Sequence, residues 1–142
     1  MQQTILYEST NRKAPKVPFS EALLKGLAPD KGLYMPDSVP EIDRASLAAM
    51  AGASYPAIAF TVARHWLKGE IGDAELEQMT LDAYNFPVPL EHVSDRNYIM
   101  RLDQGPTASF KDFAARMMGR LMQYFLGKEK RKITILTATS GD

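Results

Sequence analysis

The clearest periodic pattern in the chain lies in its last third. Gly105 and Pro106 mark a turn, since proline also biases its predecessor away from the α region. Ser109 is a suitable N-cap, and Asp112 can reach back to the cap and meet the positive end of the helix dipole. After Phe110, apolar residues recur at the spacing of one buried helical stripe, namely Phe113, Ala114, Met117, Met118, Leu121, Met122 and Phe125. This pattern predicts a helix over residues 110–126.

The remaining patterns predict a mixture of helices and strands. Apolar stretches between capping residues and glycine or proline predict helices over 21–25, 43–50, 55–68 and 73–86. Alternating or β-branched runs predict strands over 98–102 and 132–137, with short extended pieces at 4–8, 33–35 and 87–90. Strand, helix and strand in this order form a βαβ unit, which favours a parallel pair with a right-handed crossover. The expected fold class is therefore α/β, with a mainly helical first part.

Composition narrows the function classes. Basic and acidic residues balance at 17 each, so no global field recruits nucleic acid or an anionic membrane. The chain has no cysteine, which excludes disulfides and thiolate metal sites and fits a reducing compartment. The first residues lack the basic start and apolar run of a signal peptide, and no apolar stretch is long enough to span a bilayer. We therefore expect a cytoplasmic protein that binds neither nucleic acid nor membrane.

The first turn of the 110–126 helix contains a lysine that could act as a nucleophile. Lys111 lies off the apolar stripe and beside the glycine-containing turn. The positive end of the helix dipole disfavours an ammonium there, which favours the neutral amine that a nucleophilic lysine needs. Judged by capping alone, however, a solvated surface lysine is the commoner outcome. The spacing leaves both interpretations open.

The other candidate residues give weaker indications of a functional site. His65 and His92 are the only histidines, and neither has a partner at metal-ligand spacing, so we expect no metal site. Arg116 and Arg120 should line the exposed face of the Lys111 helix. We interpret them as surface residues, with a phosphate or partner contact as the alternative.

Three stretches add family information to these patterns. They are residues 19–36, the run Gly-Pro-Thr-Ala-Ser-Phe-Lys-Asp-Phe at 105–113, and the run Thr-Ala-Thr-Ser-Gly-Asp at 137–142. They resemble, in this order, the N-terminal signature, the cofactor-lysine motif and the substrate loop of threonine synthases, which are pyridoxal-phosphate enzymes of the tryptophan-synthase-β-like fold. Because the order and rough spacing also match, the resemblance covers nearly the whole chain.

The resemblance implies a domain organisation and a set of roles. Residues 1–90 would form the threonine synthase N-terminal domain, and residues 91–142 the incomplete start of the domain that binds pyridoxal 5'-phosphate. Lys111 would be the catalytic residue that carries the cofactor, and Asp142 would lie near the cofactor's ring oxygen. The substrate carboxylate would be held by the loop residues Thr139, Ser140 and Gly141.

The family converts O-phospho-L-homoserine and water to L-threonine and phosphate, with the freed lysine amine acting as base and acid. The chain ends at Asp142, inside the substrate loop. We therefore expect a truncated fold, inactive alone, that binds the cofactor weakly at most and self-associates through exposed apolar surface. Two alternatives stay open: a threonine-synthase-like lyase acting on other phosphorylated amino acids, and a non-catalytic helical interaction module.

Overall fold

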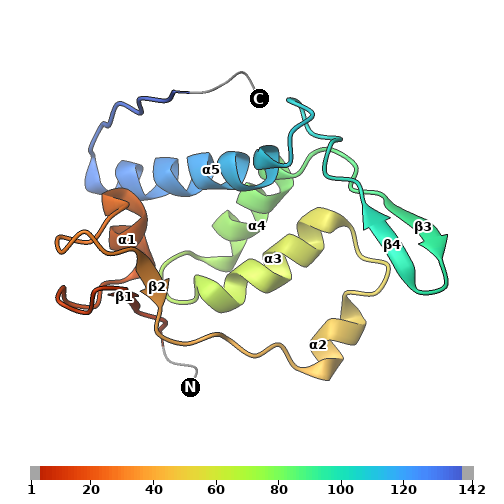
Figure 1. Ribbon diagram of the computed structural model, residues 1–142, viewed down its shortest axis with the longest axis horizontal. Coiled ribbons are helices and arrows are strands. Elements are labelled where there is room, and N and C mark those ends of the chain that lie inside the picture. The colour runs from red at the N-terminus through yellow and green to blue at the C-terminus, as the bar shows by residue number, and fades with distance from the viewer. Residues whose placement is uncertain (1–3, 139–142) are drawn as a thin grey trace. The chain divides into compact units, whose positions relative to one another are not determined.

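The computed structural model describes residues 4–138 (Figure 1). The chain divides into two compact units, Met1–Gln78 and Met79–Asp142. The division falls inside a helix, α4 (Asp73–Ala83). The domain boundary that the sequence predicts after residue 90 stays a prediction.

The first unit combines a short two-stranded sheet with helices. β1 (Tyr7–Ser9) pairs antiparallel with β2 (Tyr34–Pro36), so that Tyr7 lies opposite Pro36. The helices of this part are α1 (Phe19–Lys25), α2 (Arg44–Ala49), α3 (Tyr55–Trp66) and the first turns of α4. The prediction of helices in these stretches is confirmed. The apolar side chains that are buried in this unit are Ile5, Val17, Ala22, Ala28, Leu67, Ile71 and Leu76.

The start of α1 is capped from a distant part of the chain. Pro18 occupies the N-cap position and makes no side-chain hydrogen bond. The Glu70 carboxylate accepts instead from the backbone N–H groups of Phe19, at 2.7 Å, and Ser20, at 2.9 Å. A carboxylate in this position satisfies unpaired helical donors and meets the positive end of the dipole. The predicted start at residue 21 is therefore wrong, because Ser20 is itself helical and its N–H is one of the capped groups.

A network around Asp30 fixes the loop that follows β1. Ser9 is buried and donates its hydroxyl to Asp30 Oδ1 at 2.6 Å. Asp30 Oδ2 accepts from the backbone N–H groups of Lys13, at 2.9 Å, and Ala14, at 3.0 Å. These bonds, the one from Ser9 above all, favour the charged carboxylate and hold the pKa of Asp30 below its ordinary value.

We expect Asp30 to carry part of the acid sensitivity of folding. A carboxyl whose pKa is lower in the folded state stabilises the protein above its unfolded pKa of about 3.9, and this stability is lost as the pH falls toward the folded pKa. The urea midpoint should therefore fall less between neutral pH and about pH 3 in Asp30→Asn than in the unsubstituted chain. Glu41, which is exposed, offers the control: Glu41→Gln should keep the full fall. An unchanged fall in Asp30→Asn would contradict this role.

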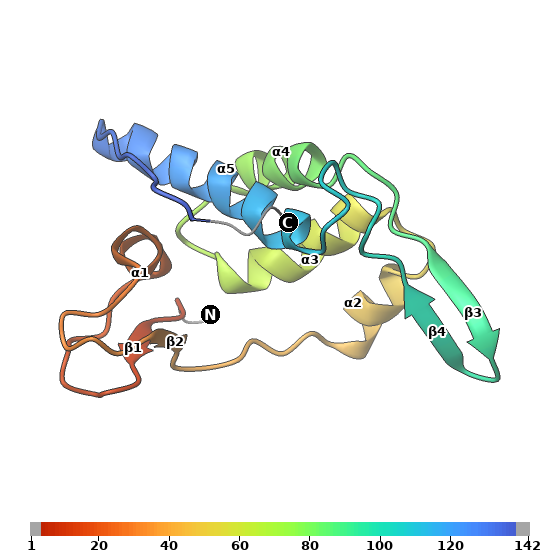
Figure 2. The same ribbon diagram turned by 45° about the horizontal axis from the view of Figure 1, so that its top comes forward.

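The second unit contains a β-hairpin and a long helix. β3 (Leu90–Ser94) and β4 (Asn97–Met100) pair antiparallel and form the two-stranded ribbon seen in Figure 2. α5 (Lys111–Glu129) follows and ends at Lys130, whose φ of 52° lies in the left-handed region. The chain then turns back in the direction of the start of α5 (Figure 1). The buried apolar residues of this unit are Met79, Ala83, Leu121 and Phe125.

The predicted βαβ unit is wrong for the part of the chain that the structure describes. Residues 132–137 form no strand there, although their β-branched composition suits one. The strand predicted over 98–102 is present as β4, but it pairs with β3 immediately before it and not with a strand after α5. A strand needs a hydrogen-bonding neighbour, and 132–137 has none among the described residues. The α/β class therefore holds in the sense that helices and strands are both present.

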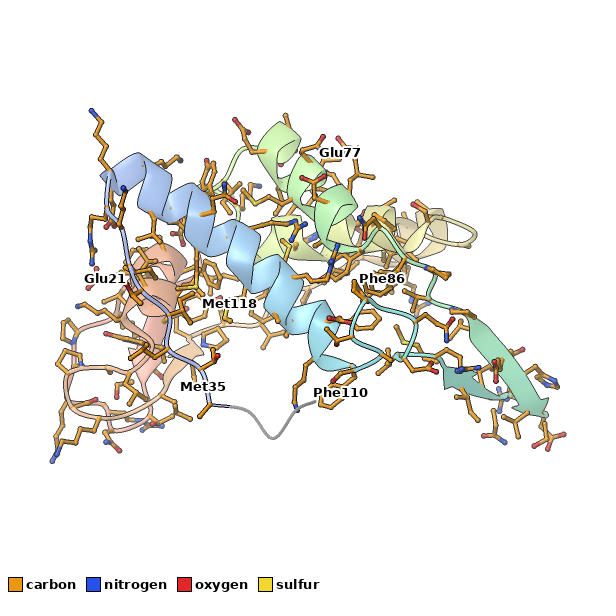
Figure 3. All side chains as sticks on the ribbon, turned by 90° about the horizontal axis from the view of Figure 1, so that it is seen from above. Glu21, Met35, Glu77, Phe86, Phe110 and Met118 are labelled. Carbon is orange, nitrogen blue, oxygen red and sulfur yellow. The ribbon has the colours of Figure 1, made fainter. Side chains whose placement is uncertain are left out.

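The apolar surface expected on α5 and on the following segment is present. Met118 on α5 is 46% exposed, and Leu136 is 92% exposed. Figure 3 labels Met118 along α5 and Phe110 at its start. Ala114, predicted inside the buried stripe, is also exposed. The stripe that is buried is thus narrower than the sequence predicts and centres on Leu121 and Phe125.

Candidate functional site

Lys111 is the first residue of α5 and is exposed. Its Nζ lies 6.0 Å from the centre of the Phe110 ring. The predicted N-cap, Ser109, is wrong by one residue, because Phe110 occupies that position and makes no side-chain cap bond. The Ser109 hydroxyl still contributes to the helix start, since it accepts from the Lys111 N–H at 3.3 Å. The lysine therefore projects from the positive end of a long helix.

The loop before Lys111 is a tight pair of turns. The Ala108 N–H donates to the Gly105 carbonyl at 3.0 Å, and the Asp112 N–H donates to the Ser109 carbonyl at 3.1 Å. Ala108 has a φ of 56°, in the left-handed region. Such a conformation costs a non-glycine residue on the order of 1 kcal/mol or more and persists only where the surroundings impose it. The loop must therefore be held by other contacts.

Asp112 provides one of these contacts. The residue is only 6% exposed, although its neighbour Lys111 is exposed. Asp112 Oδ2 accepts from the backbone N–H of Thr107 at 2.9 Å. Gly105 packs so closely on this carboxylate that a Cβ at position 105 would collide with Oδ2 and lie 2.9 Å from the Asp112 Cβ. The prediction that Asp112 reaches back to Ser109 as the cap is therefore wrong in its partner, because the carboxylate accepts from Thr107, two residues before Ser109.

Aromatic packing anchors the first turn of α5. The Tyr84 hydroxyl donates to the Phe113 carbonyl at 3.2 Å. The Phe113 ring meets the Phe86 ring edge-on, with 5.3 Å between the centroids, and Figure 3 shows Phe86 close to the start of α5. Edge-to-face pairs of this kind add to the stabilisation that burial alone gives. Lys111 is therefore an exposed residue in a helical turn whose opposite side is packed.

Arg116 and Arg120 have a structural role that the sequence did not reveal. Arg116 Nε donates to the Ala83 carbonyl at 2.6 Å, and Arg120 Nη2 donates to the Asp82 carbonyl at 2.8 Å. These carbonyls close the last turn of α4, where the backbone lacks helical partners and the dipole is negative. The interpretation as an exposed surface stripe is wrong, because both side chains are half-buried and cap a neighbouring helix.

The histidine and acidic side chains of the described residues do not gather into a metal site. Within residues 4–138, no group of three or more histidine or acidic side chains is placed to hold a metal ion. His65 Nδ1 lies 2.7 Å from the Thr61 carbonyl of its own helix. Over the same described residues, the helices are too short or too polar to cross a membrane.

Of the predicted site residues, only Lys111 lies in the part of the chain that the structure describes. Ser109, Lys111 and Asp112 meet at the start of α5 with the turn that begins at Gly105. The residues expected to hold the substrate and the cofactor ring, Thr139, Ser140, Gly141 and Asp142, lie outside the described residues. Their position relative to Lys111 therefore stays a prediction.

Comparison with known proteins decides the family. A family model described as the threonine synthase N terminus matches residues 6–84, which is more than half of the chain. The chain belongs to the threonine synthase family. Two curated relatives within that family are the threonine synthases of Corynebacterium glutamicum, 39% identical over 149 residues, and Pseudomonas aeruginosa, 36% identical over 141 residues. Both alignments cover 96% of the chain, so they include Lys111 and the loop before it.

A solved structure agrees with this assignment to the threonine synthase family. A PLP-bound threonine synthase from Brucella melitensis superposes with a TM-score of 0.85 at 36% identity, covering 90% of this chain and 29% of that one. The two curated relatives are covered over 30% and 31% of their lengths. The chain thus spans about a third or less of these family members.

Proposed function

We propose that this chain supplies the N-terminal part of a threonine synthase, an enzyme that converts O-phospho-L-homoserine and water to L-threonine and phosphate. The observation that carries the proposal is Lys111, exposed at the start of α5 on a fixed loop, in a chain of the threonine synthase family. The cofactor would be pyridoxal 5'-phosphate, as the name of the solved relative states for that protein.

The residues at the start of α5 fit this cofactor. A primary amine is the group that bonds to an aldehyde, and Lys111 presents one that solvent can reach. The helix N-terminus is favourable for the negative charge of a phosphorylated ligand. When bound, pyridoxal phosphate supplies an electron sink for negative charge that develops on a substrate carbon.

The chain's own residues would bind the substrate, position the lysine amine and transfer protons. Lys111 Nζ, held at the helix start, would take a proton from one substrate carbon and return one to another as general base and acid. Asp112 and Gly105 would fix the loop from which the amine projects. The substrate carboxylate would meet Thr139, Ser140 and Gly141, with Asp142 near the cofactor ring.

Three further expectations concern the activity of the chain alone, its self-association and its compartment. We propose that the chain by itself does not form threonine, because it spans 30% of the Pseudomonas aeruginosa relative. The apolar side chains exposed on α5 and at 133–136 would promote self-association at high concentration. The absence of cysteine fits the reducing cytoplasm.

The proposal can be tested in a hybrid enzyme. In the hybrid, this chain replaces the aligned N-terminal part of the Corynebacterium glutamicum relative. We expect the hybrid to take up pyridoxal phosphate and, after borohydride reduction, to carry it on the peptide that contains Lys111. The exposed lysines Lys128 and Lys130 in the same unit are internal controls for indiscriminate labelling. Equal labelling at all three lysines, with the host enzyme labelled selectively in parallel, would contradict the proposal.

A further inference from the structure

The carboxylate next to Lys111 in the chain is buried and bonded to the loop that precedes the lysine. Asp112 is 6% exposed, and an acidic side chain is almost never this buried unless it is paired. Its neighbour in the described network is the backbone N–H of Thr107, at 2.9 Å and five residues earlier in the chain. The carboxylate therefore connects the first turn of α5 to the middle of the loop that precedes the lysine.

Two further features of this loop are a close contact at Gly105 and a left-handed backbone at Ala108. Gly105 leaves so little space that a single added carbon would collide with Asp112 Oδ2. Ala108, which lies between Thr107 and Asp112 in the chain, has a φ of 56°. A residue without glycine's freedom keeps such a conformation only when its surroundings determine it. The bond from Thr107 and the contact with Gly105 both run to Asp112, so Ala108 lies inside the stretch of chain that they close.

We infer that Asp112 is a positioning residue whose bond to Thr107 fixes the 105–110 loop and thereby the place from which the Lys111 amine projects. What the positioned amine does rests on the proposed function. The carboxylate accepts its bond from the loop backbone. Its effect on Lys111 is therefore mechanical, and an asparagine, whose carbonyl oxygen can accept the same bond, should replace it.

The test uses the 142-residue chain without cofactor. Because the chain has no cysteine, Lys111→Cys gives a single attachment point for a nitroxide label, and Lys128→Cys gives a matched control on the same helix. In the Asp112→Ala background we expect the mobility of the label at position 111 to rise at least twofold, and amide exchange at Thr107 to accelerate at least tenfold. In the Asp112→Asn background, label mobility at position 111 and amide exchange at Thr107 should both match those of the unsubstituted background. The mobility of the label at position 128 should be the same in all backgrounds.

A second variant approaches the same contact from the opposite side. Gly105→Ala displaces the Asp112 carboxylate without removing it, and it should reproduce both changes. Unchanged spectra at position 111 in Asp112→Ala and in Gly105→Ala would overturn the inference, as would equal loosening in Asp112→Asn. If the hybrid enzyme fails to attach pyridoxal phosphate at Lys111, only the proposed function falls, because these measurements need no cofactor.

Discussion

Replacing Lys111 with arginine in the Corynebacterium glutamicum hybrid is expected to lower the rate of threonine formation at least about a hundredfold. A positioned general acid or base contributes roughly 10²–10⁴ to a rate, and Lys111 would serve in both roles. Arginine preserves the positive charge at the start of α5, but its guanidinium stays protonated and cannot accept a proton. The loss should therefore arise from chemistry and leave the helix start intact.

The matched control for this substitution lies on the same helix. Lys128 is exposed in the last turn of α5, so Lys128→Arg should leave the rate within about twofold, the ordinary result for a surface change. Far-ultraviolet circular dichroism should show the same helix content in all three proteins. A rate for Lys111→Arg within tenfold of the unsubstituted hybrid, with that hybrid active, would show that another residue performs the proton transfer.

Local rules predicted the helices well because helices are built from near neighbours. Asp43 shows this clearly: it was expected at the start of a helix, and its side chain accepts from the Ser46 N–H at 2.9 Å at the N-cap of α2. Gly26 was expected to end α1 and does so with a φ of 73°. In each case the interacting groups lie within one helical turn, so the order of residues contains the information.

The predictions that were wrong involve groups that are distant from one another in the sequence. The cap of α1 comes from Glu70, about fifty residues after the helix start, and a rule that inspects the adjacent residues selects Ser20 instead. Arg116 caps backbone carbonyls of α4, and carbonyls carry no sequence signal. The segment 132–137 has the composition of a strand, but composition does not determine whether a neighbouring strand is available.

The candidate site was predicted in part for the same reason. Lys111 and Asp112 follow from a motif and a helix start, which are both local. The burial of Asp112 depends on the close approach of Gly105, and a turn-forming glycine in the sequence does not reveal what fills the space beside it. A local pattern can thus identify a reactive residue, while its support appears only once the loop is folded.

The largest expected loss of stability comes from Leu76, which is 1% exposed in the core of the first unit. Replacing a buried leucine with alanine costs about 2–5 kcal/mol because the lost transfer free energy is compounded by a cavity, so we expect the free energy of unfolding to fall by about 3 kcal/mol. Leu81 belongs to the same helix but is 48% exposed, and Leu81→Ala makes the same change in helix propensity. Urea denaturation followed by circular dichroism should show a loss below about 1 kcal/mol for that control. Equal losses in the two variants would mean that the face of α4 that carries Leu76 does not belong to the core.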